Sequence, residues 1–217
     1  MTVSGQSRAS RGRRVPRPTG DDRERAILAT FEGLLEERGL HAISIDDIAR
    51  GAGISRPTFY FYFASKEAVL LSLFERMIEE ARANQGDALE RISDDPASGL
   101  RAAIAAHYET FRAHRSVTLA GADASATSPE VRAVWSGVME GWVAETAAGI
   151  EAERARGAAP GGVPARELAT ALVSMNERVL YATFAGHPPA VGEDSVVDVL
   201  LTIWLNAIYG GAGAPMP

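Results

Sequence analysis

Apolar residues recur with helical spacing along most of the chain. Between Asp21 and Gly39, the apolar residues lie at i, i+1, i+4, i+7 and i+8, as on one face of a helix; they are Ile27, Leu28, Phe31, Leu34 and Leu35. No segment alternates with a period of two for long enough to predict a strand. We therefore expect an all-α fold of about nine helices. Beyond the first 64 residues, helices are predicted at about 65–85, 94–111, 116–123, 128–156, 164–185 and 193–209.

Two short helices are predicted just before the first of these longer ones. Ser44 begins a capping box, in which its side chain and an acidic residue three positions later satisfy free N–H groups. Ser55 is a candidate N-cap, followed two residues later by a proline in the first helical turn. Gly51 and Gly53 supply the residues that a tight turn needs. Two short helices joined by such a turn form a helix-turn-helix.

Hydroxyl groups, a guanidinium and an amine gather around the second of these helices. Such groups, together with free N–H groups at a helix N-terminus, bind phosphate oxygens, and arginine and threonine also suit the edges of bases. The sequence therefore predicts contacts with double-stranded DNA. The predicted DNA-binding residues are Ser44, Ser55, Arg56, Thr58, Tyr60, Tyr62 and Lys66.

This region resembles the DNA-binding end of the TetR family of transcriptional repressors. The residues that carry the resemblance are Thr58, Phe59, Tyr60, Phe63, Lys66, Glu67 and Leu70. The resemblance continues through most of the chain and implies a helix-turn-helix domain at residues 21–64. It also implies a larger domain at residues 65–211 that binds an effector and dimerises, followed by a disordered tail at residues 212–217.

The charge of the chain is unevenly distributed. Residues 1–20 hold five arginines and no acidic residue, so they carry +5, and the remainder carries −11 of the net charge of −6. Their Ser, Gly, Pro and Arg composition is typical of a disordered segment. Two interpretations stay open, a solvated tail and an arm that contacts phosphates or the minor groove.

Trp135, Met139, Trp142 and Thr146 lie at steps of four, three and four, on one face of a predicted helix. An aromatic stripe at this spacing is core packing more often than the wall of a pocket. Asn176, however, lies between apolar neighbours, and a buried amide needs either a protein partner or a ligand. The resemblance implies an effector cavity, whose expected lining is Ile104, His107, Phe111, Trp135, Met139, Trp142, Thr146, Asn176, Glu177, Leu180, Tyr181 and Trp204.

The final helix carries apolar residues almost all around its axis, which predicts burial on more than one side. It could be a central helix of the core. The family resemblance instead implies a homodimer formed through the last two helices, and two-fold symmetry suits a palindromic operator.

The leading functional hypothesis is a dimeric repressor that is released from a palindromic operator by a lipophilic effector. The alternatives are a regulator that acts without a small effector and a carrier of lipophilic ligands. An enzyme is not expected because no catalytic motif, phosphate loop or metal spacing is found. We expect neither a metal nor a cofactor, no association with membranes and a cytoplasmic location, since no apolar signal peptide or membrane-spanning run occurs.

Overall fold

The structure, a computed structural model, describes residues 19–210 apart from the side chains of residues 87–90. The predicted tail at residues 212–217 lies outside this range, and so does the predicted arm except for its last two residues. These two residues correct the predicted boundary of the arm. Thr19 caps the first helix and Gly20 begins it, and the Thr19 side chain and Asp22 form a capping box that the sequence pattern did not predict.

The predicted all-α fold is confirmed, since the described residues contain nine α-helices, two short 3-10 helices and no strand. The α-helices are α1 (Gly20–Glu37), α2 (Ile45–Gly51), α3 (Arg56–Tyr62), α4 (Lys66–Glu90), α5 (Pro96–Ala113), α6 (Arg115–Thr127), α7 (Pro129–Ala155), α8 (Ala165–Ala185) and α9 (Val196–Tyr209). The 3-10 helices are η1 (Leu40–Ala42) and η2 (Arg91–Ser93).

Two helices are longer than their apolar patterns predicted. Helix α4 ends at Glu90 instead of near residue 85, and α6 covers Arg115–Thr127 instead of 116–123. In α6, the buried residues include Ala120, Gly121 and Ala124. Such small residues give a weak hydrophobic signal, so the sequence pattern underestimated the length of the helix.

The two predicted glycines of the helix-turn-helix have different roles. Gly53 lies in the turn between α2 and α3 with φ of +66°, a conformation that side chains with a Cβ rarely adopt. Gly51 ends α2, and a Cβ at this position would lie 2.4 Å from Cγ2 of Thr30 in α1. One glycine therefore permits the turn, and the other allows α2 to approach α1 closely.

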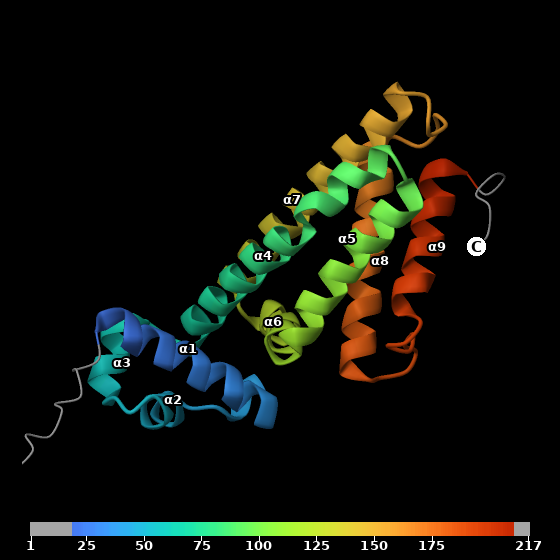
Figure 1. Ribbon diagram of the computed structural model, residues 1–217. Helices are drawn as coiled ribbons and strands as arrows, with labels where there is room; N and C mark the ends of the chain where they lie inside the picture. Colours follow the sequence, from blue (N-terminus) through green and yellow to red (C-terminus); the bar gives the residue numbers. More distant parts are fainter. Residues whose placement is uncertain (1–18, 211–217) are drawn as a thin grey trace, which may run out of the picture.

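Figure 1 shows a small head, made of α1, α2 and α3, at one end of a larger helical body. Helix α4 leaves the head and runs along the body, where it packs against α5 and α7. Helix α6 lies at the junction and contacts both α1 of the head and α4. The head is thus attached to the body through α1, α4 and α6. No helix in the described part of the chain is long and apolar enough to cross a membrane.

Candidate functional site

Helix α3 divides its aromatic residues between the core of the head and its surface. Phe59 is fully buried and Phe63, which caps the helix, is 8% exposed. Tyr60 and Phe61 are 46% and 82% exposed. The sequence prediction included Tyr60 and missed Phe61, although the helical period places Phe61 away from the buried Phe59. An exposed phenylalanine beside hydroxyl groups and an arginine indicates a contact surface.

Arg56 and Tyr60 form the polar part of this surface. The Arg56 guanidinium donates hydrogen bonds to Oδ2 of Asp46 at 3.0 Å and to the Tyr60 hydroxyl at 3.4 Å, and it lies 5.8 Å from the centre of the Tyr60 ring. Both side chains are exposed. The contact with Asp46 joins the two helices of the helix-turn-helix and holds the guanidinium beside α3.

Two of the predicted hydroxyl residues, Ser44 and Ser55, also cap helix starts. Ser44 Oγ accepts a hydrogen bond from the N–H of Asp47 at 3.1 Å, which completes the predicted capping box. Ser55 Oγ accepts one from the N–H of Thr58 at 3.3 Å, and the two hydroxyl groups share a hydrogen bond of 2.8 Å. Tyr62 is half-buried, and its hydroxyl lies near Gly20 at the start of α1. All of these residues remain at the surface of the head or at its edge.

Lys66 has a structural role that the sequence pattern did not predict. Its ammonium group donates hydrogen bonds to the carbonyl oxygens of Leu40 at 2.8 Å and Ile43 at 3.0 Å. Two of its three N–H donors therefore satisfy the backbone around η1. Lys66 therefore ties α4 to the head, and its contact with DNA stays a prediction.

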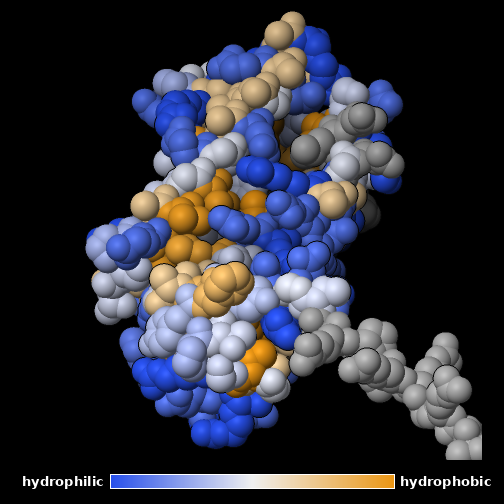
Figure 2. Space-filling view, turned by 90° about the vertical axis from the view of Figure 1, so that its left-hand side faces the viewer, coloured by the Kyte–Doolittle hydropathy of each residue, from blue (hydrophilic) through white to orange (hydrophobic). Residues whose placement is uncertain are grey.

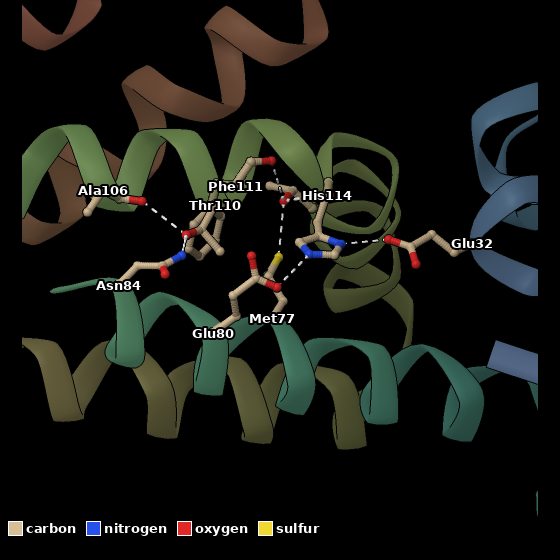
Figure 3. Close-up of polar contacts among 9 residues, drawn as sticks. Glu32, Met77, Glu80, Asn84, Ala106, Thr110, Phe111 and His114 are labelled. Carbon is tan, nitrogen blue, oxygen red and sulfur yellow. Dashed lines mark hydrogen bonds and ion pairs between the residues drawn. The ribbon is translucent and has the colours of Figure 1, made fainter. Parts of the chain in front are cut away.

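His114, between α5 and α6, connects the head to the body (Figure 3). Its Nδ1 lies 2.6 Å from Oε1 of Glu32 in α1, and its Nε2 lies 3.2 Å from Oε2 of Glu80 in α4. Burial lowers the pKa of His114, but the hydrogen bonds to the two carboxylates outweigh this effect and hold the pKa above its ordinary value. The imidazole therefore links the junction of α5 and α6 to α1 and α4, which lie far from it in the sequence.

The residues next to His114 lead from this junction to the interior of the body. The hydroxyl of Thr118 contacts the backbone carbonyls of Phe111 and His114, at 3.5 and 3.1 Å, and Sδ of Met77 in α4 at 3.6 Å. Both Thr118 and Phe111 line the main cavity. The cavity wall and the His114 junction are therefore in direct contact through Thr118.

The body encloses a cavity of about 190 Å³ between α4, α5, α6, α7, α8 and α9. All twelve residues predicted to bind a ligand line it, so the structure brings the whole predicted set together. The sequence prediction did not include several further residues that line the cavity. The missed residues include Phe74, Gln85, Thr118, Glu145, Ile150, Glu153, Ile208 and Tyr209.

The amide of Asn176 resolves one alternative that the sequence left open. Its Oδ1 accepts a hydrogen bond of 3.0 Å from Nε1 of Trp204 in α9. The amide oxygen thus has a protein partner, which holds the Asn176 side chain at the cavity wall. Trp142 differs, because its indole N–H is buried and has no hydrogen-bond partner among the described residues.

Two glutamates of the cavity lie in different environments. Glu153 is bonded by Arg156 at 2.6 Å and by the Tyr209 hydroxyl at 2.8 Å, and its pKa is lowered, chiefly by Arg156. Burial raises the pKa of Glu177, against the effect of a hydrogen bond from Trp135. The ionised form of Glu153 is therefore stabilised by Arg156 and Tyr209, whereas burial destabilises the ionised form of Glu177.

His107 forms part of the aromatic wall of the cavity. Its ring stacks on Phe111 at 4.4 Å between ring centres and meets the edge of Trp142 at 4.9 Å. Burial lowers the pKa of His107 to about 4, so the imidazole is neutral at neutral pH. Within the described residues, no group of three His, Cys, Asp or Glu is arranged to hold a metal ion.

A second hollow lies outside the main cavity, between α4 and α7, and hydrophobic side chains gather on this face of the molecule in Figure 2. Phe74 and Trp135 line both hollows, and their ring centres are 5.8 Å apart. These two rings therefore form the partition between the outer hollow and the cavity.

Helix α9 has one apolar face in the core and a second one exposed. Leu200, Trp204 and Ile208 are buried, whereas Val199 and Ile203 are 37% and 38% exposed. The two exposed residues are four positions apart and lie on one side of the helix. The other helices of the chain therefore bury only one of the two apolar faces of α9.

Comparison with known proteins identifies the family of the chain. Residues 27–73 match the family of bacterial regulatory proteins called the tetR family, and residues 100–210 match the C-terminal domain of the transcriptional regulator EthR. The chain is 56% identical to the HTH-type transcriptional regulator EthR of Mycobacterium tuberculosis over 218 residues, which covers 97% of this chain and 99% of that protein. It is 51% identical to EthR of Mycolicibacterium smegmatis, with 97% of each chain covered.

Solved structures show the same fold at lower identity. A TetR-family regulator from Syntrophomonas wolfei superposes with a TM-score of 0.71 and 18% identity, covering 91% of this chain and all of that chain. A transcriptional regulator from Saccharomonospora viridis, solved in complex with choline, superposes with a TM-score of 0.69 and 26% identity, covering 86% of this chain and 96% of that one. These relatives are regulators and not enzymes. The chain belongs to the TetR family of helix-turn-helix transcriptional regulators and is similar to EthR over almost its whole length.

Proposed function

We propose that the protein is a homodimeric repressor that binds a palindromic operator and leaves it when a lipophilic effector enters the body. The observation that carries this proposal is the aromatic cavity, whose wall residues Phe111 and Thr118 adjoin the His114 contacts with the head. An effector that binds better to a body whose head is displaced shifts the population away from the DNA-binding form. The choline-bound relative shows that a related structure was solved with a small organic molecule.

On the DNA side, the proposed contact surface is the exposed face of α3 and the helix starts beside it. Arg56 is the best candidate for a base contact, since its guanidinium is exposed and held by Asp46 and Tyr60. Ser44, Ser55, Thr58, Tyr60 and Tyr62 are proposed to contact phosphate groups, and Phe61 adds an apolar contact. Most of these contacts position the protein, so half-site spacing and DNA shape contribute to specificity.

The proposed dimer interface is the exposed apolar face of α9 together with α8. Burying Val199 and Ile203 against a second copy would complete the coverage of α9. We expect Ile203→Arg to give a monomer in sedimentation velocity and to weaken operator binding. Val163→Arg, in the loop after α7 and also at an exposed valine, is the matched control and leaves the dimer intact. A dimeric Ile203→Arg variant would show that the interface lies elsewhere.

Operator binding is tested with the intergenic DNA upstream of the protein's own gene, by fluorescence anisotropy over a range of salt concentrations. We expect a specific complex whose affinity falls at least tenfold in Arg56→Ala. Arg166→Ala removes an exposed arginine of the body that is also paired with an acid, Glu140, and leaves the affinity unchanged. Absence of a specific complex at any salt concentration rules out repression at this site and favours the ligand carrier. A complex that no lipophilic molecule weakens favours a regulator without a small effector.

A further inference from the structure

We propose that the cavity of the body takes a lipophilic cation, an aryl-alkyl ammonium compound, with Glu177 as its counter-ion. The inference rests on the proposed effector site and names the class of molecule that the site selects. It follows from the charges of the lining, from one carboxylate whose ionised form burial disfavours, and from the rings placed around it.

The charged groups of the cavity all have one sign. Among the described residues that line it, Glu145, Glu153 and Glu177 are acidic, and no lysine or arginine contributes to the wall. His107 adds no positive charge because burial keeps its imidazole neutral at neutral pH. An anionic head group would therefore be removed from water beside carboxylates and without a counter-ion, which is costly in an apolar environment.

Glu177 is the carboxylate that can accept a positive charge. Glu153 is already bonded to Arg156 and Tyr209, and Glu145 is exposed at the edge of the cavity. The Glu177 carboxylate accepts a hydrogen bond from the indole N–H of Trp135, and the charge of Arg178 favours its ionised form weakly, but burial outweighs both effects and raises its pKa. The guanidinium of Arg178 is turned to the Tyr181 ring, 5.6 Å from its centre.

Aromatic rings surround the same part of the cavity. The ring of Trp135 lies 6.0 Å from that of Trp142 and 6.4 Å from that of Phe111, measured between ring centres. Tyr181, one helical turn after Glu177, also lines the cavity. The faces of such rings attract organic cations, and the attraction is stronger where water is excluded. Aromatic faces next to the Glu177 carboxylate favour an ammonium group with an apolar tail.

These features rank three ligands of equal size. A cation gains from the rings and compensates the charge of Glu177, and its tail lies along the apolar wall. A neutral molecule gains only from the apolar wall and leaves that charge uncompensated. An anion adds a second negative charge. The cavity should therefore prefer the cation to the alcohol, and the alcohol to the carboxylate.

Calorimetric titration of the full-length protein with three probes that share one tail tests this order. The probes are 4-phenylbutyltrimethylammonium, 4-phenylbutanol and 4-phenylbutyrate. We expect the ammonium probe to bind about tenfold more tightly than the alcohol, and the carboxylate to bind most weakly. Glu177→Gln lowers the affinity for the ammonium probe about tenfold and leaves that for the alcohol within about twofold. Glu167→Gln, on the same helix α8 but outside the cavity lining, changes neither.

The outcomes separate this inference from the proposed function. If the alcohol binds as tightly as the ammonium probe, or if Glu177→Gln leaves the ammonium affinity unchanged, the inference is wrong while a lipophilic effector site remains. If none of the three probes binds to protein that still binds its operator, the inference is wrong and the cavity loses its support as the effector site. Circular dichroism of each variant confirms that the helical fold is intact.

Discussion

Nδ1 of His114 lies 2.6 Å from Oε1 of Glu32, and this contact joins the first residues of α6 in the body to α1 in the head. The same imidazole reaches Glu80 in α4 through its other nitrogen (Figure 3). The backbone carbonyl of His114 accepts a hydrogen bond from Thr118, which lines the cavity, so His114 connects the cavity wall to α1 of the head.

The His114 bridge predicts a pH dependence of stability. Its folded-state pKa is above the ordinary value, so the bridge contributes fully below pH ~6.5 and its contribution is lost as the pH rises through the raised pKa. We expect the melting temperature of the wild type to fall more than that of Glu32→Gln between pH 6 and pH 9, by roughly 2–4 °C. Glu36→Gln, one turn further along α1 and exposed, is the control and follows the wild type. Parallel curves for wild type and Glu32→Gln would disprove the bridge.

Glu177→Gln should stabilise the unliganded protein at neutral pH. Burial raises the pKa of Glu177 in the folded protein, so ionising this carboxyl group costs more in the folded state than in the unfolded state. The stability of the folded protein therefore falls as the pH rises through the raised pKa. Removing the charge relieves this cost. We expect a rise in melting temperature of roughly 1–4 °C at pH 7.5 that disappears in acid. A lower melting temperature at pH 7.5 would show that the charge is stabilised by a partner.

Gly121→Ala should disturb the cavity through Phe74. A Cβ at residue 121 would lie 1.6 Å from Cζ of Phe74, so the ring, which partitions the cavity from the outer hollow, must move. We expect a loss of about 1–3 kcal/mol in the free energy of unfolding, measured in urea, and weaker probe binding. Gly137→Ala in α7 meets no atom within 4 Å and serves as the control, with stability unchanged or slightly increased. Equal stability of the two variants would contradict the packing described for Phe74.

Lys66→Met separates the structural role of this residue from the DNA contact that its position suggested. The variant leaves the carbonyl groups of Leu40 and Ile43 without their charged donor, so we expect the free energy of unfolding to fall by about 2 kcal/mol. The salt dependence of operator binding should stay unchanged. Arg50→Met, an exposed position of α2, is the control for stability. Unchanged stability with a salt slope reduced by about one would restore the phosphate contact.

The sequence predicted what depends on local periodicity and capping. The boundaries of α2 and α3 follow from Ser44 and Ser55, whose side chains cap neighbouring N–H groups. The helical period also placed the twelve predicted cavity residues on faces that converge. Both are properties of short segments, which are encoded by residues three or four positions apart.

Contacts between distant helices were beyond the reach of the sequence pattern. Lys66 bonds to carbonyl groups 23 and 26 residues earlier, and His114 bonds to a carboxylate 82 residues earlier. Asn176 finds its partner Trp204 in the next helix. The sequence predicted only a DNA contact for Lys66 and a cavity position for Asn176 and made no prediction for His114, since periodicity indicates which face is apolar and not which residue lies opposite.

The central claim is that the cavity and α3 are coupled, and reciprocal titration tests it most directly. The ammonium probe is titrated into the free protein and into its operator complex, and the operator is titrated into protein with and without saturating probe. Thermodynamic linkage requires that bound operator weakens probe binding by the same factor as bound probe weakens operator binding. We predict that this factor is at least about fivefold. Equal probe affinity for the free and the operator-bound protein would contradict the account.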